Sequence, residues 1–166
     1  MRVEGAGKNR GETSELVAER EQTGQNNRIL ALDVGARRIG MAVSDELGWT
    51  AVGLPTLNRT RVREDVAAVA RVAGETRASQ LVLGLPLNMD GSEGEQAAYV
   101  RDFGARLVKR AGLAVEYWDE RLTSVAAAEI LSGQGAGRRR DKGDLDRVAA
   151  AVLLQEYLDA RRPGQA

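Results

Sequence analysis

The chain has 166 residues, the size of one ordinary domain, and its 43% hydrophobic and 29% charged residues are typical of a soluble globular protein. No run approaches the ~18 apolar residues that suggest a membrane span, and no apolar signal-peptide core is visible, so we expect a cytoplasmic protein without membrane contact. The absence of cysteine and histidine excludes disulfides, thiolate nucleophiles, Ser-His pairs and imidazole metal sites. Carboxylates remain as the main candidates for acid–base work and for binding hard cations such as Mg²⁺ or Mn²⁺.

Composition divides the chain into three parts. Residues 1–27 are polar, with few apolar side chains that could join a core, and we expect a disordered N-terminal extension. Residues 161–166 resemble a frayed tail. The segment 28–160 between them is predicted to form one domain, and it shows no internal repeat.

The first half of this domain predicts three strands and a helix. Short apolar runs at 28–34, 39–45 and 49–57 are joined by tight turns, which favours an antiparallel meander. Apolar positions at helical spacing follow between Val62 and Ala73, and Thr60 is expected to cap this helix.

The second half alternates strands and helices. The continuously apolar run 80–86 predicts a central strand buried on both faces. Ser92 and Glu95 have capping-box spacing before a helical stripe that ends near Leu107. The remaining predicted elements are a strand at 113–120, a short helix at 123–131, a basic loop and a last helix from residue 144 to residue 160. This order predicts an α/β fold with a mixed sheet covered by helices.

Four sequence blocks resemble one family. The blocks are "LALDVGARRIGMAVSD", "LVLGLPLNMDGSEGEQ", "DERLTSVAAAEIL" and "KGDLDRVAAAVLLQEYL". In this order and spacing they are similar to the signature blocks of the YqgF/RuvX family, whose members are described as pre-16S rRNA nucleases or Holliday-junction resolvase-like proteins. The resemblance implies an RNase H-like mixed five-stranded sheet, with antiparallel first three strands, then parallel strands, and helices on both faces.

Three carboxylates are the candidate catalytic and metal-binding residues. Asp33 ends a core strand directly before a turn; it is either a turn former or a metal ligand held rigidly by that strand. The resemblance implies that Glu120, in the "DERLTS" block, and Asp146, before the alanine-rich stretch, are the other two active-site acids. Taken alone, Asp146 is equally explained by the helix macrodipole, and Asp119 is the better helix-cap candidate beside Glu120.

Physical chemistry favours metal-dependent hydrolysis if these acids meet. Crowded carboxylates repel one another, and one or two divalent cations would stabilise them. Two ions about 3.5–4 Å apart can activate a water for attack on a phosphodiester without a protein nucleophile. We therefore expect a hydrolase acting on ester bonds, a two-metal-ion nuclease using Mg²⁺ or Mn²⁺. The resemblance further implies 5′-phosphate and 3′-hydroxyl products.

Local basic patches must supply any affinity for nucleic acid, because the net charge is zero. The run "GRRRDKG" precedes Asp146 and is either a solvated loop or a phosphate-binding arm. The few aromatic residues, among them Trp49 and Tyr99, are expected to pack in the core. The candidate nucleic-acid contacts are Arg37, Arg38, Asn88, Arg121, Arg138, Arg139, Arg140 and Lys142.

Several functions remain open at this point. The resemblance favours processing of pre-16S rRNA in ribosome biogenesis, with cleavage of Holliday junctions or other branched DNA as the alternative. A junction resolvase would be expected to act as a homodimer. A non-enzymatic nucleic-acid-binding processing factor is a third hypothesis, which three clustered acids would disfavour. The hydrophobic-Asp-x-Gly opening also occurs in sugar kinases and actin-like ATPases, but this chain lacks the second such block that those proteins need.

Overall fold

The computed structural model describes residues 27–122 and 142–162. Almost all of the predicted extension, the helix predicted over 123–131, and Arg138 to Arg140 lie outside these residues. The described strands are β1 (Arg28–Val34), β2 (Arg38–Ser44), β3 (Ala51–Asn58), β4 (Ala78–Leu85) and β5 (Ala114–Asp119). The described helices are α2 (Val62–Glu75), α3 (Glu95–Ala111), the 3₁₀ turn η1 (Glu120–Leu122) and α5 (Lys142–Arg161).

The described strands form one five-stranded sheet in the order β3-β2-β1-β4-β5. β1 pairs antiparallel with β2, and β2 with β3, whereas β1–β4 and β4–β5 are parallel pairs. This confirms the predicted mixed sheet. Its consequence for function is geometric: β1, β4 and β5 all run in the same direction, so residues that follow their carboxyl ends share one edge of the sheet.

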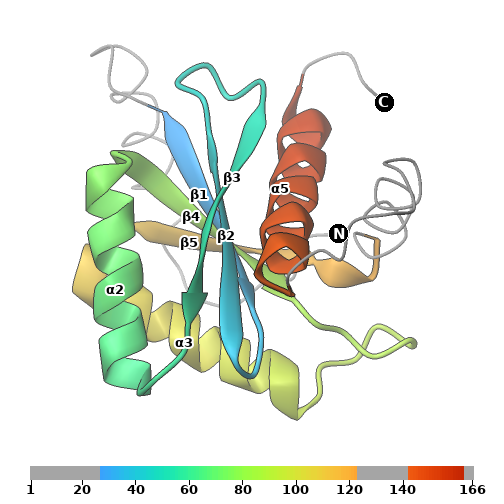
Figure 1. The fold of residues 1–166 in the computed structure, drawn as a ribbon. Helices are drawn as coiled ribbons and strands as arrows, with labels where there is room; N and C mark the ends of the chain where they lie inside the picture. Colours follow the sequence, from blue (N-terminus) through green and yellow to red (C-terminus); the bar gives the residue numbers. More distant parts are fainter. Residues whose placement is uncertain (1–26, 123–141, 163–166) are drawn as a thin grey trace, which may run out of the picture.

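Helices cover both faces, as predicted. Figure 1 shows α5 on one side of the sheet and α2 and α3 on the other. In β1, Leu30 and Leu32 belong to the core under α2 and α3, while Ile29 and Ala31 pack with α5. Because side chains alternate between the faces of a strand, Asp33 continues the series that faces α5.

Two predicted helix caps are wrong. The N-cap of α2 is Arg61, and no side chain caps that end; instead the carboxylate of Asp65 accepts the backbone N–H of Thr60 at 3.0 Å. The N-cap of α3 is Gly94, and the hydroxyl of Ser92 donates to Asp90. The Thr60 hydroxyl donates to Glu64 at 3.1 Å, so the side chain of each predicted cap donates to a nearby acid and neither residue is the N-cap.

Trp49 is a further correction, because it does not pack in the core. Its side chain is 55% exposed, and the Arg162 guanidinium lies 4.6 Å from its ring centroid. None of the described helices is both long and apolar enough to span a bilayer.

Candidate active site

A row of three residues crosses the sheet beneath the amino-terminal end of α5. Asp33 lies opposite Gly40 in the β1–β2 pair. On its other side, Leu32 pairs with Leu83, so Gly84 follows beside Asp33 one residue further along β4. A carboxylate is thus flanked on both sides by residues without side chains, which leaves room above the sheet for other elements.

Gly40 allows α5 to approach the sheet closely. A Cβ atom built on Gly40 would lie 2.9 Å from the carbonyl carbon of Asp146 and closer still to its oxygen. Asp146 is therefore seated over β2 beside Asp33, although the two are more than 100 residues apart in sequence. Because α5 begins at Lys142 and not at residue 144, Asp146 lies two residues further into the helix than the sequence pattern predicts.

Gly84 makes the matching space for Glu120. A Cβ atom there would lie 2.7 Å from Glu120 Cγ and 2.6 Å from Leu153 Cδ1. The side chain of Glu120 therefore leans from the end of β5 back over β4, toward Asp33. Leu153 of α5 packs beside it and shields it from water.

Substituting these glycines tests the arrangement. We expect Gly40→Ala to lower the free energy of unfolding by about 2–3 kcal/mol, because the new methyl group overlaps the α5 backbone and must displace it. Chemical denaturation measures this effect. Gly74→Ala is the matched control, since a Cβ there meets nothing within 4 Å, and it should leave stability unchanged or raise it by up to ~1 kcal/mol. Equal effects of the two substitutions would contradict the close approach of α5.

Asp33 and Glu120 form a carboxyl pair. Burial and a hydrogen bond with Asp33 raise the pKa of Glu120 to about 8, and the negative charges of Asp33 and Asp119 add to the effect. A hydrogen bond between two carboxyl groups needs a proton on one of them, because two ionised carboxylates at this distance would repel each other. With its pKa raised to about 8, Glu120 keeps its proton at neutral pH, in a place where a cation would equally relieve the repulsion.

Asp146 is held by an arginine. Arg38 Nε donates to Asp146 Oδ2 at 2.6 Å, and the two side chains are 30% and 29% exposed. The structure thus brings Arg38, predicted to contact nucleic acid, onto one of the predicted metal ligands. Within 27–122 and 142–162, no three Asp or Glu side chains gather closely enough to hold a metal ion together.

Asp119 and Arg121 form a second ion pair beside the carboxyl pair. Arg121 Nη2 lies 2.7 Å from Asp119 Oδ2, and the hydrogen bonds from Arg121 lower the pKa of Asp119. The Asp119 carboxylate also accepts the Arg121 backbone N–H at 2.9 Å, at the start of η1; the helix that it was expected to cap lies outside the described residues. Asp119 is therefore kept ionised and occupied, whereas Glu120 is kept protonated.

Arg121 also connects the site to the loop after β4. Its Nη1 donates to the carbonyl oxygen of Met89 at 3.3 Å. The neighbouring Asn88 donates its side-chain amide to Ser92 at 3.0 Å, so this predicted nucleic-acid contact is first of all a loop-ordering residue. The loop tip is open to solvent, with Met89 94% exposed.

The other predicted nucleic-acid contacts take different places. Arg37 lies in the β1–β2 turn and lines a hollow on the α2–α3 side of the sheet. Lys142 is exposed at the first residue of α5, and Arg138, Arg139 and Arg140 are outside the described residues.

The sequence analysis did not identify Gly40 and Gly84 as residues that shape the site, nor Arg59 as a residue that lines the hollow. An isolated glycine inside each strand was the available signal for the first two, since it marks a close approach of another group.

The donor set fits a divalent cation. Asp33 and Glu120 offer carboxylate oxygens alone, the ligands that Mg²⁺ and Mn²⁺ prefer, and their shared proton marks a position where positive charge is favourable. Asp146 stands over the same face of the sheet, with one oxygen engaged by Arg38.

Solved structures with this fold bind branched DNA. RuvC of Thermus thermophilus in complex with a Holliday junction substrate superposes with a TM-score of 0.55 at 18% identity, covering 81% of this chain and 95% of that one. The Holliday junction resolvase of fowlpox virus gives a TM-score of 0.51 at 11% identity, covering 80% and 98%. At such identities the likeness concerns the fold alone, and it confirms the predicted RNase H-like architecture.

Sequence relatives are much closer. A protein of Myxococcus xanthus named "Putative pre-16S rRNA nuclease" is 49% identical over 136 residues, which are 82% of this chain and 90% of that protein. One of the same name from Moorella thermoacetica is 48% identical over 132 residues, covering 80% and 94%. The model of the family described as "RuvX: Holliday junction resolvase" matches residues 27–160. The chain therefore belongs to the RuvX family.

Proposed function

We propose that this protein is a metal-dependent nuclease that hydrolyses phosphodiester bonds in the processing of pre-16S rRNA. The observation that carries the proposal is the Asp33–Glu120 carboxyl pair, built over Gly84 at the edge where parallel strands end. A structural acid pair in this position would only destabilise the fold. The names of relatives at 48% and 49% identity support rRNA as the substrate.

Asp33 and Glu120 are the first two proposed metal ligands, and Asp146, which does not form one cluster with them while Arg38 holds it, is the proposed third. When bound, divalent cations would lower the pKa of a water and stabilise charge on the phosphodiester oxygens. Asp33, fixed by strand pairing on both sides, sets the position of the site. Glu120 would hold a cation in its ionised form, and Leu153 of α5 reaches the same space over Gly84.

Arg38 has two roles in this proposal. It orients Asp146 through the 2.6 Å contact, and its guanidinium is the nearest described cation to the carboxylates for holding a substrate phosphate. Asp146 Oδ2 would be available to hold a divalent cation only if it were released from Arg38, whose guanidinium would then be free to hold a phosphate. Arg121, bound to Asp119, is the second proposed phosphate contact.

Arg38→Ala should therefore bind Mn²⁺ about two- to fivefold more tightly, because a competing ion pair worth up to ~1 kcal/mol is gone. Isothermal titration calorimetry measures the affinity directly. Arg106→Ala is the control, since it removes an exposed ion pair with Asp102 elsewhere. In the Asp146→Asn background the Arg38 substitution should have no further effect; unchanged affinity in the wild-type background would refute the competition.

Cleavage assays test the proposed function. Purified protein is incubated with structured RNA carrying a small-subunit precursor end, and with four-way DNA junctions, in Mg²⁺, Mn²⁺ or chelator. We expect cleavage of the RNA that needs the metal. Faster cleavage of the junction would favour the branched-DNA alternative, and binding of either substrate without cleavage would favour the non-enzymatic processing factor.

A further inference from the structure

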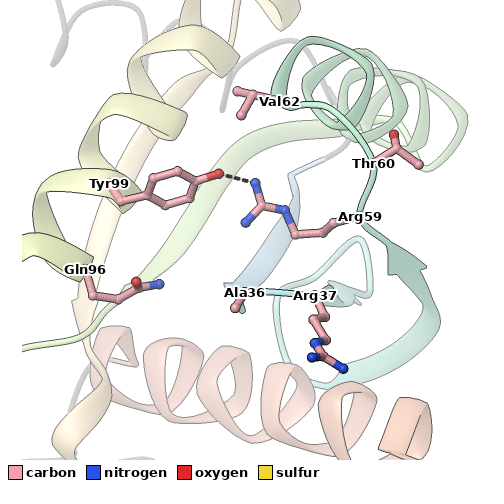
Figure 2. A pocket seen from close by; sticks show the side chains of 7 residues that line it. All are labelled: Ala36, Arg37, Arg59, Thr60, Val62, Gln96 and Tyr99. Carbon is pink, nitrogen blue, oxygen red and sulfur yellow. Dashed lines mark hydrogen bonds between the residues drawn. The ribbon is translucent and has the colours of Figure 1, made fainter.

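A polar hollow opens on the other side of the β1–β2 turn from the carboxyl pair. Its volume is about 630 Å³, within the range of small-ligand sites. Figure 2 shows Gln96 and Tyr99 of α3 on one side, Arg59, Thr60 and Val62 on the other, and Ala36 and Arg37 of the turn at its end. The hollow thus brings together residues 36–37, residues 59–62 and α3, which begins more than 30 positions after Val62.

Arg59 forms one wall of this hollow, and its buried guanidinium is hydrogen-bonded through each of its nitrogens. The side chain of Arg59 is only 10% exposed and pairs with Asp65, which is 2% exposed, at 3.1 Å. Its Nη1 donates to the carbonyl oxygen of Gly35 at 2.9 Å, and its Nη2 donates to the Tyr99 hydroxyl. The guanidinium also lies 5.1 Å from the Tyr99 ring centroid. Such a network fixes the wall rigidly.

The network leaves hydrogen-bond donors available among the residues that line the hollow. Because the Tyr99 oxygen accepts from Arg59, its own O–H can donate to a ligand. Among the described residues, no hydrogen bond or ion pair engages the Gln96 amide or the Arg37 guanidinium. Together these groups supply hydroxyl, amide and guanidinium donors, while Val62 and Ala36 add apolar surface.

The hollow is tied to the active site through the turn. Asp33 is two residues before Gly35, whose carbonyl oxygen Arg59 binds. The Arg59 backbone N–H donates to the Arg37 carbonyl oxygen at 2.9 Å. Within the turn, the Gly35 backbone N–H donates to the Arg38 carbonyl oxygen at 2.9 Å. Arg38 of this turn reaches Asp146, and Arg37 lines the hollow. The β1–β2 turn therefore places Arg37 at the hollow and the adjacent Arg38 at Asp146 in the active site.

We propose that the hollow binds one phosphorylated nucleoside unit of the substrate strand, outside the position that is cleaved. Arg37 holds the phosphate, the Tyr99 O–H and the Gln96 amide contact the carbonyl oxygen acceptors of the base, and Val62 packs against its apolar face. An acceptor-rich, partly apolar ligand of this size matches the donors present. The inference rests on the proposed function, since it takes the substrate to be a nucleic acid strand.

Direct binding of uridine 5′-monophosphate tests this site without relying on cleavage. In chelator, NMR titration should shift the signals of Gln96, Tyr99 and Arg37. Gln96→Ala and Tyr99→Phe should each weaken binding about two- to tenfold, the effect of one hydrogen bond. Tyr117→Phe is the matched control, because its hydroxyl donates to the Arg101 carbonyl oxygen instead and should leave the affinity unchanged.

Two further arms identify the ligand. A single-stranded RNA of ten nucleotides should shift the same signals and displace the mononucleotide, as expected if a strand occupies the hollow. Inorganic phosphate should bind more weakly than the nucleotide; equal binding would overturn the assignment of a nucleoside unit. Absent shifts at Gln96 and Tyr99 with either nucleotide ligand, in a protein that still cleaves RNA, would overturn the inference and leave the proposed function standing. Shifts without any cleavage would contradict the nuclease proposal alone.

Discussion

Glu120→Gln should lower the rate of metal-dependent RNA cleavage by about a thousandfold, which corresponds to losing ~4 kcal/mol of transition-state stabilisation. Glutamine keeps the size of the side chain and its place over Gly84, so the fold survives. It lacks the charge that would hold a divalent cation beside Asp33. Asp33→Asn and Asp146→Asn should have effects of the same order, because each removes one proposed ligand. Single-turnover cleavage at saturating Mn²⁺ measures the rates.

Asp102→Asn is the control for this experiment. Asp102 is an exposed acid on α3, paired with Arg106 at 3.0 Å, on the face of the sheet away from Asp33. Its substitution should leave the cleavage rate within a factor of two. If wild type and all three site variants cleaved equally, the activity would belong to a contaminating nuclease and the carboxyl pair would have no catalytic role.

Local pattern predicted the order of the elements and a mixed sheet covered by helices, and the resemblance to a family supplied the RNase H-like arrangement of the strands. The predicted strand over 28–34 coincides with β1, since a buried strand between polar residues has few alternative boundaries. The contact between Asp33 and Glu120 agrees with what the resemblance implied, since the carboxyl ends of parallel strands share an edge of the sheet. In these cases the information lies in adjacent residues and in one topological rule.

What the sequence did not reveal depends on how separate elements meet. The ion pair between Arg38 and Asp146 exists because Gly40 lets α5 descend onto β2, and no local pattern specifies that contact. Arg59 follows a strand end in the sequence, where an arginine is normally solvated, yet its side chain is buried against Asp65. Only the packing of α2 against α3 creates the hollow that it walls.

The carboxyl pair also predicts how stability depends on pH. The pKa of Glu120 rises from 4.5 to about 8 in the folded protein, so between these values the folded state holds a proton that the unfolded state has released. Because the unfolded state binds fewer protons in this window, the free energy of unfolding falls as pH rises, by up to ~1.4 kcal/mol per pH unit. Glu120→Gln lacks this titration and should be the more stable protein at pH 8.

Urea denaturation in chelator from pH 5 to pH 8.5 measures this difference. The wild-type free energy of unfolding should decline relative to that of Glu120→Gln, and other titrating groups cancel because both proteins contain them. Adding Mn²⁺ should flatten the wild-type decline, since a cation takes over the role of the shared proton. Parallel curves for the two proteins in chelator would show that Glu120 ionises normally. In that case the carboxylates would be too far apart or too well hydrated to interact, and the electrostatic basis for a cation between them would be lost.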